Sequence, residues 1–241
     1  MTQPSQDEAS LPFYKTVKRK FQDVDLEGGV NTAQFCEAVD AVIAFFDLFT
    51  NAPFAIIRSD LASKVAKVRE RLASQPSSSG TLEALLKDEK DKGVVGKPEA
   101  VTGALTWLMR SLRFTGMGLR KNMANASEEV STSMTWAYGQ ALKPYHGWAV
   151  RPIFLVSPPS PRSTADSSIS TPPSPYLRVH SLRQLAMKAV PYRSNFYAVL
   201  GEPADDVMRE LELWLDGLDK ILTRMEAVYK EGRYGSMDGK P

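Results

Sequence analysis

Cysteine and histidine are scarce in this chain of 241 residues. It has one cysteine, Cys36, and two histidines, His146 and His180. One cysteine cannot form an intramolecular disulfide, and the spacing of these three residues fits no zinc site. Because Cys36 lies in a stretch with helical apolar spacing, we expect it to be a small buried hydrophobic residue. We therefore expect no disulfide, no metal and no other cofactor.

Long hydrophobic runs and a strong net charge are also lacking. The most apolar run, 39–49, is too short to span a bilayer and contains Asp40 and Asp47. Residues 1–10 are polar and acidic, unlike the basic and then apolar start of a signal peptide. The net charge of +2 is too small to indicate bulk binding of nucleic acid. We expect a cytosolic protein that binds no nucleic acid and touches membrane surfaces transiently without crossing them.

Common catalytic motifs are missing as well. The sequence has no serine-hydrolase elbow, no phosphate-binding P-loop and no dinucleotide fingerprint. Asp60 and His146 could be imagined as an acid–base pair, but no third orienting group or metal site accompanies them. We therefore expect a protein that is not an enzyme and has no catalytic residues.

Apolar residues recur at helical spacing along most of the chain, and no alternating strand pattern of useful length is present. Asn31 followed by Gln34 resembles the capping box of a helix start, and Pro203 suits a first helical turn. The pattern predicts an all-α domain of seven or eight helices. The predicted helices cover 32–49, 59 or 60 to 72, 81–87, 99–122, 127–143, 145–155 and 203–228.

The ends of the chain differ from its centre in composition. Residues 1–11 and 232–241 are mostly polar, and we expect both to be flexible tails. Between them, 12–231 is predicted to be a single domain.

A segment rich in proline and serine, 156–184, interrupts this domain. Its composition does not suit a packed core. One interpretation is a disordered surface insertion. Another is an unspliced intron, because its removal joins Leu155 to Leu185 and restores one apolar helix. Its first and last codons can also match the usual intron ends, and sequencing of the mature transcript distinguishes the two.

Three charged residues form a first candidate site. Asp60, Lys64 and Lys67 are spaced i, i+4 and i+7, so they share one face of a helix. One acceptor flanked by two cations could hold a polar headgroup with mixed donor and acceptor character. The alternative is a solvated surface with salt bridges.

A second candidate site combines Trp107, Arg110 and His146. An indole face can stack on a sugar ring, and a guanidinium group suits a phosphate. The imidazole could donate a hydrogen bond to a buried carbonyl. The alternatives are a core tryptophan, a surface arginine and a structural histidine.

Three pieces of sequence, taken in their order and spacing, resemble the glycolipid transfer protein family. The resemblance runs from about Phe13 to Val228, apart from the segment rich in proline. It implies a two-layer α-helical sandwich of about eight helices that binds one sphingolipid. The headgroup would lie at a surface site and the two hydrocarbon chains in an apolar tunnel. The pieces are Ala104–Phe114, Ala141–Trp148 and Ala189–Phe196.

The resemblance also assigns roles to the candidate residues. Asp60 resembles the acidic residue that accepts from the ceramide amide, and His146 the histidine that donates to the acyl carbonyl. Trp107 resembles the tryptophan on which the first sugar stacks, and Lys67 the lysine that contacts sugar. Lys64 departs from the pattern, because glycolipid-specific members have asparagine there and carriers of ceramide-1-phosphate have lysine.

Those carriers of ceramide-1-phosphate use arginine in place of the tryptophan, so this chain mixes the two patterns. An acidic sugar headgroup would reconcile Trp107 with Lys64, and Arg110 would help to define it. Trp148, beside His146, is a candidate membrane anchor, since indole favours the water–lipid boundary. The alternative for Trp148 is core packing.

We therefore expect transfer of a sphingolipid, with a glycosphingolipid as the first choice. The alternatives are transfer of ceramide-1-phosphate or another phosphosphingolipid, and a sphingolipid sensor that acts through partner proteins.

Overall fold

The computed structural model describes residues 12–48, 52–146, 192–201, 204–235 and 237. These residues form eight α-helices and no strand, so the all-α prediction is confirmed for the part of the chain described. Two short 3-10 turns, Phe21–Asp23 and Pro76–Ser78, accompany them. The helices are α1 (Phe13–Thr16), α2 (Thr32–Asp47), α3 (Ala52–Ser74), α4 (Leu82–Asp91), α5 (Thr102–Ala124), α6 (Val130–Ala141), α9 (Arg193–Ala198) and α10 (Ala204–Gly232).

The predicted start of α3 is wrong. We expected this helix to begin at 59 or 60, but it begins at Ala52. Pro53 then lies in the first helical turn, where its missing N–H has no intrahelical acceptor to lose. Pro53 therefore lies at the start of α3 and does not delay the helix to residue 59 or 60.

The helices α1 and α9 were not predicted, because a helix of one or two turns contains too few residues to show the helical period. α1 has four residues and α9 has six. The helix predicted over 145–155, from residue 147 onward, and the segment 156–184 lie outside the described residues.

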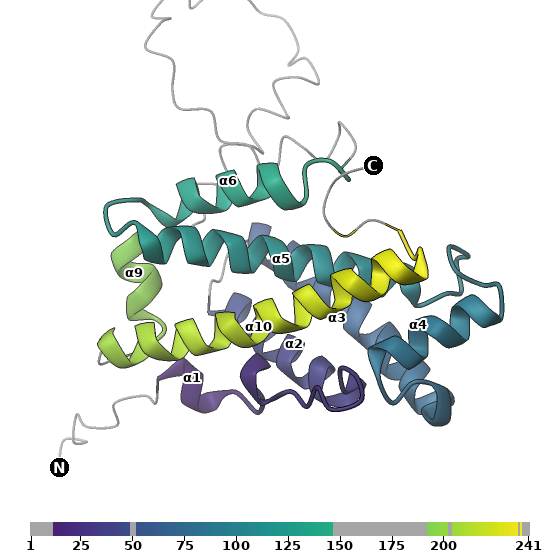
Figure 1. The fold of residues 1–241 in the computed structure, drawn as a ribbon. Coiled ribbons are helices and arrows are strands. Elements are labelled where there is room, and N and C mark those ends of the chain that lie inside the picture. Colours follow the sequence, from purple (N-terminus) through teal and green to yellow (C-terminus); the bar gives the residue numbers. More distant parts are fainter. Residues whose placement is uncertain (1–11, 49–51, 147–191, 202–203, 236, 238–241) are drawn as a thin grey trace, which may run out of the picture.

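Helix α5 occupies the middle of the molecule (Figure 1). It packs along α6 on one side, and it also contacts α3 and α10. Helix α10 runs diagonally across this arrangement, while α2 lies against α3. Since α5 carries Trp107 and Arg110, both candidate residues lie on a helix that α3, α6 and α10 contact.

The core is built from the helix faces that the apolar spacing marks. Phe35 and Val39 of α2 lie in one buried cluster with Val65 of α3, Leu108 of α5 and Ile221 of α10. Burying each such side chain contributes about 1.5–3 kcal/mol to the free energy of unfolding. This core fixes α3 and α5 against each other.

Cys36 is fully buried in the same core, as predicted. Burial raises the pKa of its thiol to about 12. The side chain therefore stays protonated at neutral pH and is not a nucleophile.

A buried carboxylate from another helix caps the start of α5. Glu89 of α4 accepts hydrogen bonds from the backbone N–H of Val101 at 2.7 Å and of Thr102 at 2.9 Å. It also accepts from the hydroxyl of Thr102 at 2.5 Å. These bonds satisfy donors that the first turn of a helix leaves open. The cap comes from a residue twelve positions earlier, so local sequence signals did not reveal it.

Part of the segment 232–241 packs on the domain. The ring of Tyr234 lies against that of Tyr229, with centroids 5.8 Å apart. Met237 is 3% exposed and belongs to the main core cluster. The described portion of this terminal segment therefore contributes to the core.

Candidate functional site

The first candidate site consists of three charged residues of α3, namely Asp60, Lys64 and Lys67. Lys64 donates a hydrogen bond from Nζ to the carboxylate of Asp60, one turn away. The side chain of Asp60 is 50% exposed and that of Lys64 is 19% exposed. Lys67 instead donates to the backbone carbonyl of Pro98 at 2.8 Å, in the loop before α5. The pair thus presents a carboxylate to solvent beside a lysine whose side chain is mostly buried.

The second group gathers around the indole of Trp107. The imidazole of His146 stacks on it, with ring centroids 5.5 Å apart and planes inclined by 19°. The guanidinium carbon of Arg110 lies 5.2 Å from the Trp107 ring centroid and 3.3 Å from that of Tyr145. The hydroxyl of Tyr138 lies 3.2 Å from Nδ1 of His146. We call these five residues the aromatic cluster.

The aromatic cluster depends on the turn that follows α6. The backbone N–H groups of Tyr145 and His146 both donate to the carbonyl of Leu142, at 3.0 and 3.2 Å. This turn folds the chain back onto α6 and carries the two side chains to α5. The packing of α6 along α5 then brings His146 onto Trp107, although 39 positions separate them in the sequence.

Two members of the aromatic cluster, Tyr138 and Tyr145, were not among the predicted site residues. Tyr145 directly precedes His146, so its proximity was available as a signal. Tyr138 lies eight positions before His146, and only the turn after α6 explains their contact.

Arg110 supplies a partly buried positive charge to the cluster. Burial lowers the pKa of its guanidinium, while a hydrogen bond with Tyr145 opposes that change. An arginine in a protein keeps its charge under these conditions. Arg113, one turn further along α5, pairs with Glu226 of α10 at 2.7 Å. Of these two arginines, Arg110 is the one that lies in the aromatic cluster.

The two groups lie on neighbouring helices. Helix α3, which carries Asp60 and Lys64, contacts α5, which carries Trp107 and Arg110. The structure therefore brings Trp107, Arg110 and His146 into contact and places the Asp60–Lys64 pair on the adjacent helix. Trp148 lies outside the described residues.

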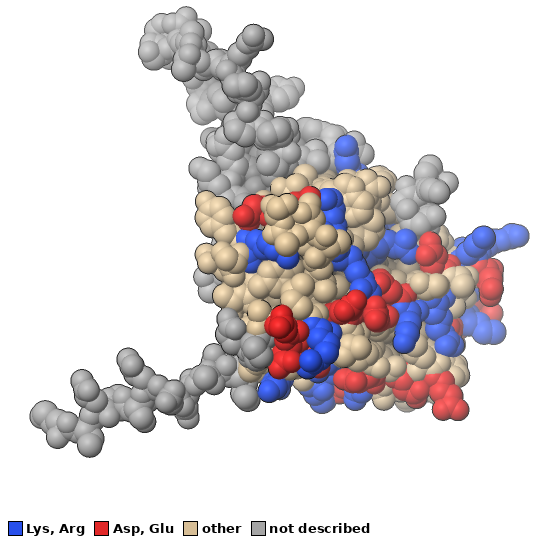
Figure 2. All heavy atoms as spheres, turned by 60° about the vertical axis from the view of Figure 1, so that its left-hand side comes forward, with Lys and Arg blue, Asp and Glu red and all other residues tan. Residues whose placement is uncertain are grey.

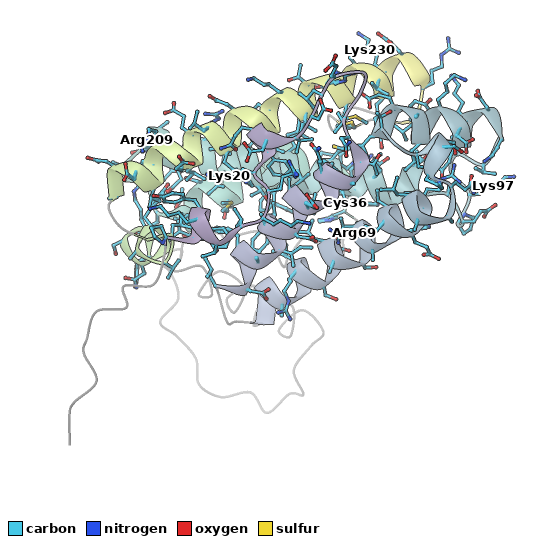
Figure 3. The ribbon with its side chains drawn as sticks, turned by 90° about the horizontal axis from the view of Figure 1, so that it is seen from below. Lys20, Cys36, Arg69, Lys97, Arg209 and Lys230 are labelled. Carbon is cyan, nitrogen blue, oxygen red and sulfur yellow. The ribbon has the colours of Figure 1, made fainter. Side chains whose placement is uncertain are left out.

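An apolar pocket lies beside the segment 13–20, which includes α1. The volume of its cavity is about 60 Å³, and its walls include Phe45, Leu119, Leu211 and Trp214. Figure 3 shows the N-terminal segment with Lys20 running along α10. The surface at this end of the molecule has broad areas without charged side chains (Figure 2).

Helix α5 contributes residues both to this pocket and to the aromatic cluster. Thr115 and Leu119, both in its wall, follow Trp107 by 8 and 12 residues on this helix. At 1.5 Å per residue they lie about 12 and 18 Å further along the helix axis. An ion pair between Lys20 and Glu210, at 2.7 Å, also lines the pocket.

Within the described ranges, no three or more histidine, cysteine, aspartate or glutamate side chains are arranged to hold a metal ion. Among the helices that the structure describes, none combines the length and apolarity needed to cross a bilayer.

Sequence comparison identifies relatives over most of the chain. A glycolipid transfer protein of Aureobasidium melanogenum is 34% identical over 211 residues, which cover 87% of this chain and 89% of the relative. Pleckstrin homology domain-containing family A member 8 of Canis lupus familiaris is 24% identical over 255 residues. That match covers 95% of this chain but 43% of the relative, so the chain spans less than half of its length.

Structure comparison gives the same fold. HET-C2, described as a fungal glycolipid transfer protein, matches with a TM-score of 0.71 at 29% identity, covering 90% of this chain and 96% of HET-C2. Human ceramide-1-phosphate transfer protein, in complex with 12:0 ceramide-1-phosphate, matches in fold with a TM-score of 0.73 at 18% identity. That match covers 95% of this chain and 100% of the human protein. The predicted two-layer α-helical sandwich is thereby confirmed.

The family described as glycolipid transfer protein matches residues 30–159, more than half of the chain. The match includes the helices that carry Asp60, Trp107 and Tyr138 and the turn that carries His146. Together with the relative at 34% identity, it shows that the chain belongs to the glycolipid transfer protein family.

Proposed function

We propose that this protein binds one glycosphingolipid and transfers it between membranes, without changing it chemically. The observation that carries the proposal is the aromatic cluster, in which Trp107, Arg110 and His146 meet beside the helix that holds Asp60. Membership in a family of lipid transfer proteins supports the activity, and the name of the relative from Aureobasidium melanogenum supports the lipid class.

The proposed specificity for a sphingolipid rests on its amide group. Asp60 accepts a hydrogen bond from the amide N–H, and His146 donates one to the amide carbonyl. A glycerolipid carries esters, which have no N–H to donate. A polar group that the bound lipid covers and leaves without a partner costs about 1–3 kcal/mol, so this pair disfavours glycerolipids.

The proposed headgroup site combines an indole with positive charges. Trp107 offers a ring face on which a sugar stacks, and Lys67 provides a further donor towards sugar hydroxyls. Lys64 and Arg110 favour an anionic substituent on that sugar, such as a sulfate or a phosphate.

The same two cations favour a second candidate, ceramide-1-phosphate. The human protein that shares this fold binds that lipid according to its description, although at 18% identity the likeness concerns the fold. A sphingolipid sensor that acts through partner proteins would use the same binding residues. Transfer between vesicles separates a carrier from a sensor, because a sensor need not release its ligand to a second membrane.

We assign the end of a hydrocarbon chain to the apolar pocket, whose cavity of about 60 Å³ has to widen before it admits more of the lipid. Two residues of its wall, Thr115 and Leu119, lie about 12 and 18 Å along α5 from Trp107, and one leaflet of a bilayer provides about 15 Å of hydrocarbon. The distance therefore suits a lipid whose headgroup rests at the aromatic cluster. Each methylene group that the pocket buries contributes about 0.8 kcal/mol, which offsets the loss of bilayer contacts without catalysis.

Filling this pocket is expected to impair the binding of long chains. Leu211→Trp places an indole in a pocket wall, so we expect transfer of a lipid with a long acyl chain to fall about tenfold. Displacing two methylene groups from the pocket accounts for a change of that size. The measurement is fluorescence-detected transfer between vesicles for lipids with long and two-carbon acyl chains.

Leu213→Trp is the matched control, because Leu213 lies on the same helix, is 45% exposed and does not line the pocket. Its transfer rates should equal those of the unmodified protein. If Leu211→Trp slows both lipids equally, or not at all, the pocket does not hold the chains.

The experiment that tests the whole proposal is a transfer competition. Labelled glycosphingolipid is moved between vesicles in the presence of unlabelled neutral glycosphingolipid, sulfated glycosphingolipid, ceramide-1-phosphate or a glycerophospholipid. We expect the sulfated glycolipid to compete best and the glycerophospholipid not to compete. Stronger competition by ceramide-1-phosphate than by either glycolipid would select the second candidate.

We also propose that Trp148 contacts the membrane and that the protein acts in the cytosol. Trp148 follows His146 by two positions in the sequence, and an indole favours the boundary between water and lipid. The contact is transient, because a carrier must release the membrane in order to transfer its ligand.

A further inference from the structure

Tyr138 holds one edge of the His146 imidazole. Its side chain is 1% exposed, and its hydroxyl lies 3.2 Å from Nδ1. Trp107 stacks on the face of the same imidazole ring. The ring is therefore fixed both at its Nδ1 edge and on one face.

The chemistry of this contact determines what Nε2 can bind. A neutral imidazole has one nitrogen that donates and one that accepts. If the Tyr138 hydroxyl donates to Nδ1, the proton of the imidazole is on Nε2, and Nε2 donates. If the hydroxyl instead accepts from Nδ1–H, then Nε2 becomes an acceptor. A phenol is a stronger proton donor than a neutral imidazole N–H, so the first arrangement is favoured.

We propose that Tyr138 is a positioning residue that donates its hydroxyl proton to Nδ1 of His146 and thereby keeps Nε2 as the hydrogen-bond donor for the lipid amide carbonyl. This inference rests on the proposed function, since the amide is the ligand group concerned.

The tautomer matters because of the partner on α3. An amide presents one donor, its N–H, and one acceptor, its carbonyl. Asp60 is an acceptor, so the site matches an amide when His146 supplies the donor. With the proton on Nδ1, Asp60 and Nε2 would both be acceptors, and the carbonyl would lose its partner. Tyr138 thus completes the complementarity of the site without touching the lipid.

Two measurements test the role of Tyr138. The chain contains two histidines, so a protein labelled with ¹⁵N-histidine gives few ring signals, and H146Q assigns those of His146. At a pH of about 8 or above, where imidazole is neutral, we expect the His146 proton on Nε2. In Tyr138→Phe we expect a mixture of both tautomers and a fall in glycosphingolipid transfer of about tenfold, which corresponds to one lost hydrogen bond.

Tyr197→Phe is the matched control. It removes the hydroxyl of a half-buried tyrosine, which donates to Oδ1 of Asn122 at 3.0 Å, far along the chain from His146. We expect this variant to keep the tautomer and the transfer rate of the unmodified protein. A general loss of packing would instead lower transfer in both variants.

The outcomes separate this inference from the proposed function. A proton on Nδ1 in the unmodified protein, or an unchanged tautomer and transfer rate in Tyr138→Phe, overturns the role of Tyr138. Absence of sphingolipid transfer by the unmodified protein refutes the function, while the ring signals still report the Tyr138 contact. If Tyr138→Phe does not fold, the tautomer of the unmodified protein decides the question.

Discussion

Asp60→Val is expected to lower sphingolipid transfer by about 100-fold or more while leaving the fold intact. The carboxylate would accept hydrogen bonds from the amide and from a headgroup hydroxyl, and each bond to a charged group contributes about 1.5–3 kcal/mol. Losing two such bonds accounts for at least two powers of ten. Transfer between vesicles measures the effect.

The effect on stability should be small. Asp60 is half exposed and pairs with Lys64 one turn away on the same helix, and such pairs contribute about 0.3–0.5 kcal/mol. We therefore expect Tm to change by less than about 3 °C in a thermal unfolding experiment.

Asp91→Val provides the matched control for this substitution. Asp91 pairs with Lys87 at the same spacing on α4, a helix that contributes no residue to the aromatic cluster. Its loss should leave transfer unchanged. Transfer by Asp60→Val at the rate of the unmodified protein would refute the assignment of the amide site.

Trp107→Ala is expected to reduce transfer of glycosphingolipid about tenfold more than transfer of ceramide-1-phosphate. The indole face contributes to binding where a sugar ring stacks on it, and a phosphate group on the ceramide offers no such ring. The substitution also removes packing against His146 and Tyr145, which lowers stability. That loss affects both lipids equally, so the ratio of the two transfer rates isolates the stacking contribution.

Trp136→Ala is the control for tryptophan loss in general. Trp136 lies on α6, is 42% exposed and contacts Lys121 rather than the aromatic cluster. The ratio of the two transfer rates should not change in this variant. Equal losses for both lipids in Trp107→Ala would show that Trp107 acts by packing alone.

The candidate residues on α3 show which contacts sequence spacing predicts and which it does not. Positions four apart on a helix are neighbours whatever else the chain does, so the contact between Asp60 and Lys64 follows from the sequence. Spacing did not show that Lys67 turns to the carbonyl of Pro98. That contact depends on where the loop before α5 lies.

Helix caps also fall into two classes, those that a nearby residue in the sequence provides and those that another helix provides. Asn31 accepts from the backbone N–H of Gln34 at 3.0 Å, within one turn, and the sequence predicted it. The cap of α5 comes from Glu89 on another helix, and it exists because α4 packs where its carboxylate reaches the two open N–H groups. A short-range signal identifies the first cap and misses the second.

The sequence by itself determined the all-α class, most helix positions, the apolar faces of the core and the residue types of the candidate site. Each follows from a period of 3.6 residues or from chemistry that a side chain carries in any fold. The tertiary structure alone decided that Trp107, Arg110, Tyr138 and His146 meet, and that a pocket opens further along α5. Contacts between helices depend on how those helices pack and on the direction that the chain takes after a turn. The spacing of residues within one segment determines neither.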